Sequence, residues 1–315
     1  MQIIQAPRAS AIIYSLLVTR KDTSPWLLPA NICPIVPITF LKAQVPFQFV
    51  DISPHTLHMD LEQAEALIKN GTFGGLLYAH TYGEASTPNE FFGSVKSLFP
   101  DLMIIDDRCL CIPDLEHDPA NKADVQLYST GYAKIADLNF GGYAFMSDAM
   151  VYQTAHAPFN PVHHEEVEKA YKAAISQRKK FVYQESNWLE TNTPIPSWDQ
   201  YRGQVKKSLA GSLEHRISLN QVYAGILPAE VQLPAPFQIW RFNVRIRDKQ
   251  RILDAIFSSG LFASSHYASL AGIMDDGKAP EAEALERSII NLFNDHHFSL
   301  DQAERVCKII SENLV

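Results

Sequence analysis

Three segments between residues 102 and 147 decide the fold: LMIIDDRCLCIP (102–113), ADVQLYSTGYAK (123–134) and FGGYAFMS (140–147). The first begins with an apolar run that ends in Asp106 and Asp107. The second ends its apolar run in Ser129 and Thr130, four residues before Lys134. A short apolar run bounded by polar or glycine residues is typical of a buried strand. These segments therefore predict neighbouring strands with chemically useful side chains at their ends.

The preceding residues alternate between strand and helix patterns. Strands are predicted at 26–29, 46–52, 74–80 and 102–106, and helices at 8–18, 33–42, 61–68 and 88–98. Such alternation favours an α/β fold with a mostly parallel sheet covered on both faces. The strands at 125–129 and 143–147 are closer together, so part of the sheet is expected to be antiparallel or crossed by loops.

The second half of the chain has a different pattern. Long, charged, amphipathic helices are predicted at 165–188 and 198–215, before a proline-rich linker that starts at Pro228. Strands at 236–246 and 288–293 and helices at 248–260 and 299–314 then predict a small α+β domain. We therefore expect a large α/β domain at 1–155, bridging helices at 156–230 and a small domain at 231–315.

The composition excludes several classes of protein. The 315 residues are 46% hydrophobic and 20% charged, which describes an ordinary globular chain. A net charge of -8 argues against non-specific nucleic-acid binding. Four scattered cysteines favour reduced thiols and a cytoplasmic location, and no apolar run predicts a membrane span. Neither GxGxxG nor a P-loop is present, and the histidines lack the HExxH spacing of a zinc helix.

The polar residues at the predicted strand ends point to a bound cofactor. Ligands of open α/β sheets bind outside the carboxyl ends of the strands. The polar residues there are Asp51, His80, Asp106, Asp107, Ser129 and Thr130, with Lys134 just beyond. A lysine in a crevice can form a Schiff base, and an aspartate can keep a pyridine nitrogen protonated. Backbone N–H groups at Ala9 and Ser10, with the Ser129 hydroxyl, suit a phosphate.

These residues together predict a site for pyridoxal 5'-phosphate (PLP). A single aspartate at a strand end is more often a cap, and a single lysine in a loop is usually a surface residue. The ordered combination is what favours the cofactor. In the second half, His266 and Tyr267 are a further pair that could face the same crevice.

The quoted segments also resemble a known family. RASAIIYSLL (8–17), YAHTYGE (78–84), IIDDRCLCIP (104–113), DVQLYSTGYAK (124–134) and EHRISLNQVYAGIL (214–227) follow the order and spacing of the DegT/StrS-type aminotransferases, which are fold type I PLP enzymes. The resemblance implies that Lys134 is the Schiff-base lysine and Asp107 the partner of the pyridine nitrogen. It assigns Ser129, Ala9 and Ser10 to the phosphate. Arg216 falls in the segment that reaches the phosphate from a neighbouring subunit, which implies a homodimer.

Two pocket positions and the start of the chain depart from the family pattern. Leu110 stands where glutamine or histidine meets the ring hydroxyl, and Cys33 where an aromatic residue commonly stacks on the ring. The chain also begins almost at the phosphate turn. The family's reaction is transfer of an amino group from glutamate to a keto-sugar on a nucleotide. The departures keep two alternatives open: a PLP-dependent lyase or other amino-acid chemistry, and a non-catalytic binding protein.

Overall fold

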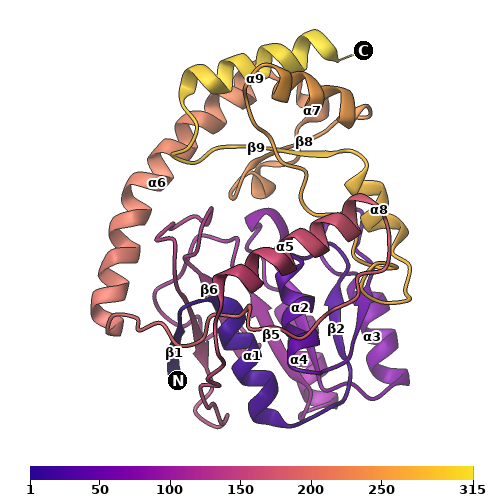
Figure 1. The fold of residues 1–315 in the computed structure, drawn as a ribbon, viewed down its shortest axis with the longest axis vertical. Coiled ribbons are helices and arrows are strands. Elements are labelled where there is room, and N and C mark those ends of the chain that lie inside the picture. Colours follow the sequence, from indigo (N-terminus) through magenta and orange to yellow (C-terminus); the bar gives the residue numbers. More distant parts are fainter. Residues whose placement is uncertain (315) are drawn as a thin grey trace.

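The computed structural model describes residues 1–314. It contains a seven-stranded sheet of order β1-β7-β6-β5-β4-β2-β3 and a separate pair β8-β9 (Figure 1). The large sheet comprises β1 (Gln2–Ala6), β2 (Trp26–Pro29), β3 (Phe47–Val50), β4 (Gly75–Ala79), β5 (Met103–Asp107), β6 (Val125–Ser129) and β7 (Gly142–Met146). The strands from β3 to β6 run parallel, which confirms the predicted mostly parallel sheet.

Four helices cover the two faces of this sheet. They are α1 (Ala9–Arg20), α2 (Ile35–Lys42), α3 (Leu61–Asn70) and α4 (Asn89–Leu98), and a 3-10 turn, η1 (Thr81–Gly83), follows β4. Successive strand residues point to opposite faces. Accordingly Leu28 packs in the cluster that contains α1 and α2, whereas its neighbour Leu27 packs in the cluster that contains α3 and α4. Both faces of the sheet are therefore buried.

The edge of the sheet holds one strand that the sequence did not predict. β1 pairs antiparallel with β7, from Gln2 opposite Met146 to Ala6 opposite Gly142. β7 is also antiparallel to β6, so the expected antiparallel part of the sheet is confirmed. The β1 sequence QIIQA lacks strict alternation, and its side chains are mostly half-buried, as befits an edge strand.

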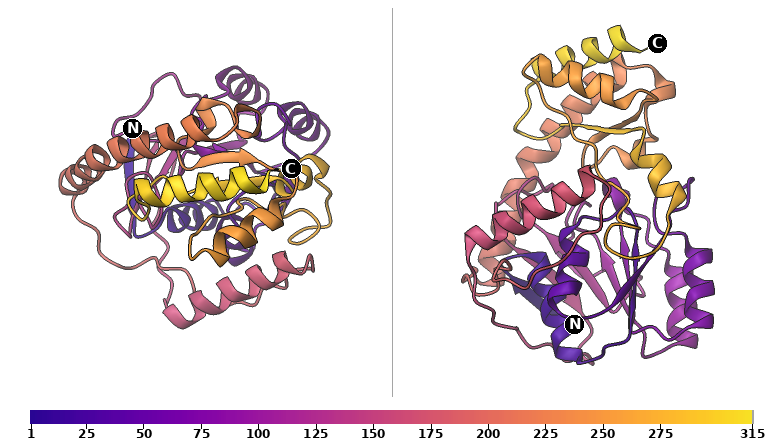
Figure 2. Two further views of the ribbon diagram at one scale, coloured as in Figure 1. Left: turned by 90° about the horizontal axis from the view of Figure 1, so that it is seen from above. Right: turned by 45° about the vertical axis from the view of Figure 1, so that its right-hand side comes forward.

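Two helices connect the large domain to a small one. α5 (Pro161–Ser176) lies beside the large domain, and the 29-residue α6 (Trp198–Ile226) runs along both domains (Figures 1 and 2). The small domain contains β8 (Phe242–Arg245), α7 (Lys249–Ser258), β9 (Ile289–Leu292) and α9 (Leu300–Asn313), after the turns η2 (Ala229–Val231) and η3 (Ala235–Phe237). A capping box at Ser299 and Gln302 starts α9.

Several predicted boundaries in this half were wrong. The helix expected over 165–188 ends at Ser176, and the one expected over 198–215 continues to Ile226. The strand expected over 236–246 is limited to β8, since η3 occupies its start. The domain boundaries themselves stay predictions.

A segment between α7 and β9 returns to the large domain. Residues 264–288 include α8 (Pro280–Glu286), and Tyr267 and Leu270 belong to the same core cluster as α1 and α2. The Leu270 N–H donates to the Ala30 carbonyl at 2.9 Å. The Asp51 carboxylate, at the end of β3, accepts the N–H groups of the first turn of α8 at 2.9 Å each. This segment thus anchors the small domain on the carboxyl ends of the strands.

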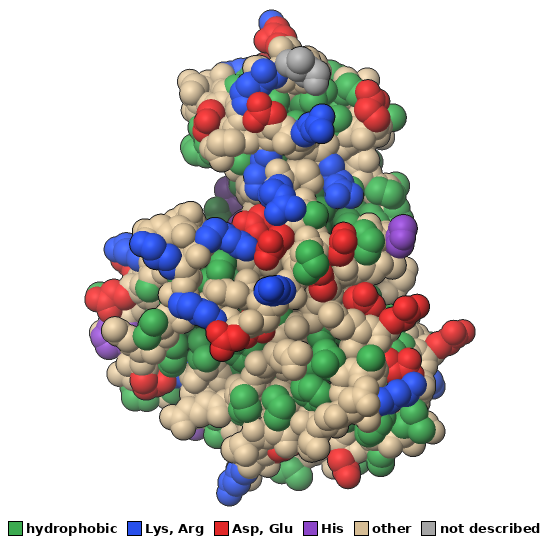
Figure 3. All heavy atoms as spheres, turned by 90° about the vertical axis from the view of Figure 1, so that its right-hand side faces the viewer, with side chains coloured by type: hydrophobic (Ala, Val, Ile, Leu, Met, Phe, Trp, Pro, Cys, Tyr) green, Lys and Arg blue, Asp and Glu red, His purple; other side chains and the backbone are tan. Residues whose placement is uncertain are grey.

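The surface is mixed in character. On the face shown in Figure 3, basic side chains gather at the waist between the two domains, with acidic side chains close below. Arg178, at the end of α5, forms ion pairs with Glu283 and Glu286 of α8. Across residues 1–314, no helix is both long enough and apolar enough to cross a membrane.

Candidate functional site

A small pocket lies at the carboxyl ends of β2, β4 and β5. Its lining contains Asn31, Ile32, Cys33, Ala79, His80, Thr81, Asp107, Cys109, Leu110, Lys134 and Tyr267. Three residues predicted from the sequence, Cys33, Asp107 and Lys134, therefore meet in one place although they are far apart in the chain. The meeting follows from the parallel strands, whose carboxyl ends share one edge of the sheet.

Asp107 is the last residue of β5 and is buried in the pocket wall. Its Oδ1 accepts the N–H of Cys109 at 3.0 Å. Burial raises the pKa of this carboxyl, although Cys109 and the charge of Lys134 oppose the rise. A cationic group placed in the pocket would stabilise the ionised carboxylate.

Lys134 follows β6 in a loop that spans residues 130–141. Among residues 1–314, its amine takes part in no hydrogen bond or ion pair. Cys33, Asp107, Cys109 and Lys134 all line the pocket, and the charge of Lys134 acts to lower the pKa values of the other three. A half-buried amine in a pocket lined by an acid and two thiols is placed to react with a bound carbonyl.

The residues predicted for a phosphate lie together next to this loop. Ser129 at the end of β6 pairs with Gly142, and a Cβ placed on Gly142 would lie 2.5 Å from the Ala9 nitrogen. Glycine at this position therefore lets the start of α1, with Ala9 and Ser10, approach Ser129 closely. Among the described residues, no side chain caps α1, so its first N–H groups lack the usual side-chain acceptor.

Arg8 is a neighbouring residue that the sequence reasoning did not select. A Cβ placed on Gly131 would lie 3.6 Å from the Ser129 hydroxyl and 4.0 Å from Arg8 Nη1. Arg8 Nε pairs with Glu190 at 3.2 Å, and the arginine side chain is 41% exposed. The sequence did offer a signal for Arg8, because it immediately precedes Ala9. A positively charged side chain beside the start of a helix can contribute to binding an anion such as phosphate.

His80 lines the pocket and forms a buried pair with Asp106. His80 Nε2 contacts Asp106 Oδ1 at 2.6 Å, and Nδ1 contacts the Glu84 carbonyl oxygen at 2.8 Å. Both nitrogens of the His80 ring therefore have oxygen partners, which fix the orientation of the ring. Burial alone would raise the pKa of Asp106, but His80, Arg108 and Asn121 together hold it below its usual value.

A second histidine, His58, lies behind this pair and is neutral. Its Nε2 faces the Thr81 carbonyl oxygen at 3.4 Å, and its Nδ1 accepts the Tyr78 hydroxyl at 2.9 Å. Burial and the nearby His80 lower the pKa of His58 to about 4.

Leu110 and Cys33, which depart from the family pattern in the sequence, both line the pocket. Leu110 offers no polar atom, and burial raises the pKa of the Cys33 thiol. The aromatic member of the lining is Tyr267, whose ring stacks on Trp240 with centroids 6.0 Å apart. Tyr267 comes from the 264–288 segment, so the fold brings in an aromatic ring from a distant part of the chain.

Three other residues considered from the sequence lie elsewhere. Asp51 caps α8, and Thr130 bonds to the Phe140 carbonyl and the Tyr201 hydroxyl. Arg216 is buried on α6 and donates to Ser212 Oγ, Asn294 Oδ1 and the carbonyl oxygens of Trp240 and Lys134. Its role at the phosphate of a neighbouring subunit stays a prediction, and its contacts within the chain favour a different role.

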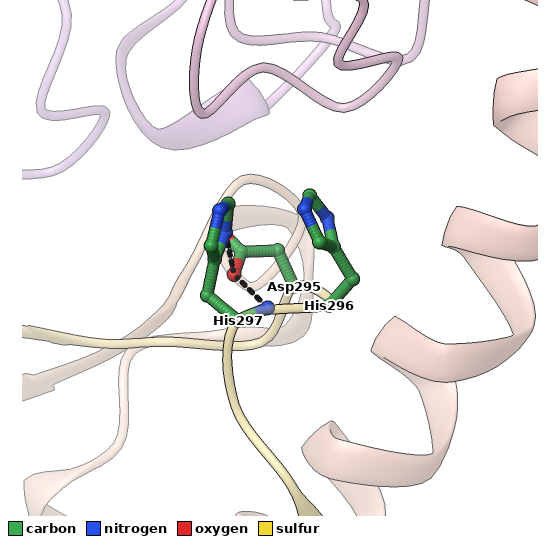
Figure 4. A group of neighbouring side chains, drawn as sticks. All are labelled: Asp295, His296 and His297. Carbon is green, nitrogen blue, oxygen red and sulfur yellow. Dashed lines mark hydrogen bonds and ion pairs between the residues drawn. The ribbon is translucent and has the colours of Figure 1, made fainter.

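Asp295, His296 and His297 form a group of side chains that could hold a metal ion (Figure 4). In the figure, both imidazole rings point the same way from the loop after β9. The Asp295 carboxylate is already engaged, since Oδ2 pairs with Arg241 and Oδ1 accepts from the backbone and Nδ1 of His297. We therefore interpret this carboxylate as the partner of a buried arginine.

No family model matches the sequence, and no curated protein matches it either. Solved structures do match. A DegT DnrJ EryC1 StrS aminotransferase from Brucella abortus is 16% identical with a TM-score of 0.69, covering 100% of this chain and 86% of its own. DesI in the presence of its TDP-sugar product is 15% identical with a TM-score of 0.72, and the match covers 98% of this chain and 80% of DesI. The GDP-4-keto-6-deoxy-D-mannose-3-dehydratase of E. coli with bound hydrated PLP is 13% identical with a TM-score of 0.64, at 98% and 87% coverage.

These matches define the class of fold. The chain has the fold of the fold type I PLP-dependent aminotransferases over nearly its whole length. The predicted fold class and the predicted resemblance are confirmed at this level.

Proposed function

We propose that the protein is a PLP-dependent aminotransferase. The observation that carries the proposal is the shared pocket of Lys134 and Asp107, an unpaired amine beside a buried acid. Ser129 and the uncapped start of α1 lie next to the loop that holds Lys134. They offer a hydroxyl and backbone N–H groups as hydrogen-bond donors for a phosphate. The donor set therefore fits an aldehyde, a pyridine nitrogen and a phosphate, which are the three functional ends of PLP.

Each of these groups has a definite task. Lys134 would hold the cofactor through its amine, and the same amine would serve as the acid–base group of the site. Asp107 keeps the ring nitrogen charged, and the N–H groups at Ala9 and Ser10 with the Ser129 hydroxyl hold the phosphate. When bound, PLP supplies an electron sink for the substrate carbon.

We further propose glutamate as the amino donor and a keto-sugar, carried on a nucleotide, as the acceptor. Support comes from the match to DesI, whose structure was solved with a TDP-sugar product. A homodimer is part of the proposal, and light scattering of the purified protein tests it.

Substitution of Lys134 tests the proposal directly. Wild-type protein incubated with PLP is expected to show the visible absorbance of lysine-bound cofactor, and Lys134→Ala is expected to lose it completely. Lys207→Ala, which removes an exposed lysine from α6, is the matched control and should keep the band. Wild-type protein that gains no band at saturating PLP would refute the proposal.

A second candidate is a PLP-dependent lyase or another reaction of an amino acid. Leu110 favours it, because an apolar side chain in the lining changes what contacts the ring. The fold is also shared by a dehydratase. Conversion of bound PLP to the pyridoxamine form by glutamate supports transamination, and its absence favours the lyase. Tight PLP binding without turnover of any donor would favour a non-catalytic role.

A further inference from the structure

The backbone around Lys134 is held by side chains from outside the large domain. Trp240 Nε1 donates to the Ala133 carbonyl at 2.9 Å, and Arg216 Nη2 donates to the Lys134 carbonyl at 3.2 Å. Ser212 Oγ donates to the Ile135 carbonyl at 2.7 Å. Three consecutive carbonyl groups thus each receive a donor, two from α6 and one from Trp240, which lies two residues before β8.

The donors are themselves fixed in place. Arg216 Nη1 donates to the Trp240 carbonyl at 2.7 Å and to Asn294 Oδ1 at 2.5 Å, and its Nε donates to Ser212 Oγ at 3.1 Å. All three donor residues are therefore joined to one another through the Arg216 guanidinium. Burial and the neighbouring Arg241 lower the pKa of Arg216 to about 10, so Arg216 stays charged at neutral pH.

We propose that Trp240, Arg216 and Ser212 are positioning residues that hold Lys134 in place for its reaction, and we name them the carbonyl clamp. A lysine side chain has several flexible torsions, so a defined reach requires a fixed backbone. The segment itself is short and irregular, and α6 and the small domain supply the missing restraint. This role rests on the proposed function of Lys134, and it makes the amine's position depend on where the small domain sits.

Two conservative substitutions each remove a hydrogen-bond donor of the carbonyl clamp and largely keep the shape of the side chain. Trp240→Phe deletes the Nε1 donor but keeps an aromatic ring against Tyr267, and Ser212→Ala deletes only the hydroxyl. Ser218→Ala is the matched control, since Ser218 lies on the same helix and, within residues 1–314, its hydroxyl bonds only to the Glu214 carbonyl of that helix. Thermal unfolding of each variant establishes that it is folded.

The first readout uses protein without cofactor. Hydrogen exchange of the amides of Ala133, Lys134 and Leu138, each bonded within the segment, reports local opening. We expect roughly threefold to tenfold faster exchange in Trp240→Phe and Ser212→Ala, and no change in Ser218→Ala. Unchanged exchange in both clamp variants would overturn the proposal.

The second readout follows PLP itself. Borohydride reduction traps PLP on Lys134, and the modified peptide is located by its mass. We expect this trapping to slow by a similar factor in the clamp variants. We also expect a change in the pH at which the visible absorbance band is half-formed. Normal trapping rates in the variants would contradict the clamp alone. Failure of the wild type to trap PLP at Lys134 would contradict the proposed function. The hydrogen-exchange experiment, which needs no cofactor, would still test whether the carbonyl clamp restrains the backbone.

Discussion

Arg8 is the side chain through which the proposed phosphate site can be tested. Its guanidinium lies near the Ser129 hydroxyl and the start of α1, and Glu190 competes for it. A phosphate beside Arg8 would gain a charge-assisted hydrogen bond, and removal of Glu190 would free the arginine for it.

Arg8→Gln is therefore expected to weaken PLP binding by about tenfold, whereas Glu190→Gln is expected to tighten it. Pyridoxal, which lacks the phosphate, provides the control ligand, and its affinity should be unchanged in both variants. Fluorescence titration of the two ligands measures the effect. An equal loss of affinity for both ligands in Arg8→Gln would contradict a phosphate contact.

Single residues also show where sequence reasoning succeeds. Asp107 could be placed in the pocket because it ends a strand, and Lys134 because it closely follows the next strand; both line the pocket, and their roles stay predictions. Tyr267 was only one possibility, and Arg216 was given a role at a partner's phosphate rather than behind Lys134. The positions of these two side chains depend on how the second half of the chain packs, which local patterns do not contain.

At the scale of elements, β7 and α1 approach each other closely at the proposed phosphate site. Gly142 opens β7 opposite Ser129, and its missing side chain leaves room for the start of α1. Any Cβ there would meet backbone atoms, which cannot move away without shifting the helix.

Gly142→Ala is expected to lower the free energy of unfolding by about 1–3 kcal/mol and to weaken PLP binding. Gly211→Ala offers a control, because this glycine is exposed on α6 and no atom of the described part of the chain lies within 4 Å of an added Cβ. Alanine in a helix interior should stabilise by about 0.5–1 kcal/mol. Urea unfolding compares the two, and equal effects would contradict a steric requirement at Gly142.

The elements of the large sheet were largely predictable, whereas several elsewhere were not. β2 to β7 carry apolar runs bounded by turn residues, and these runs were found within one or two residues. β1 was missed because an edge strand needs no buried face. α8 was missed because it is short and begins where the distant Asp51 caps it.

Across the whole molecule, buried histidines link stability to pH. Burial lowers the pKa of His58, and separately that of His266, to about 4. The unfolded state therefore binds more protons than the folded state between the ordinary histidine pKa, about 6.5, and that value. The contribution of each histidine to the free energy of unfolding is therefore complete above about pH 6.5. It is lost as the pH falls from about 6.5 to about 4, by up to about 3 kcal/mol per histidine.

His58→Gln keeps a donor for Thr81 and an acceptor for Tyr78 but cannot take up a proton. We expect the wild type to lose more unfolding free energy than this variant between about pH 7.5 and about pH 5. Urea unfolding at the two pH values measures the difference. Glu84, 3.7 Å from His58, opposes the effect. Parallel losses in the two proteins would show that His58 does not titrate on unfolding.

The return of residues 264–288 to the large domain has a consequence for engineering the chain. These residues leave the small domain after α7, contribute Tyr267 and Leu270 to the core beside α1 and α2, and come back at β9. A chimera that exchanges the small domain for another must therefore be spliced at three junctions rather than one. A recombinant 231–315 fragment would carry an apolar stretch without its natural covering, and the remaining chain would lack one wall of its own pocket.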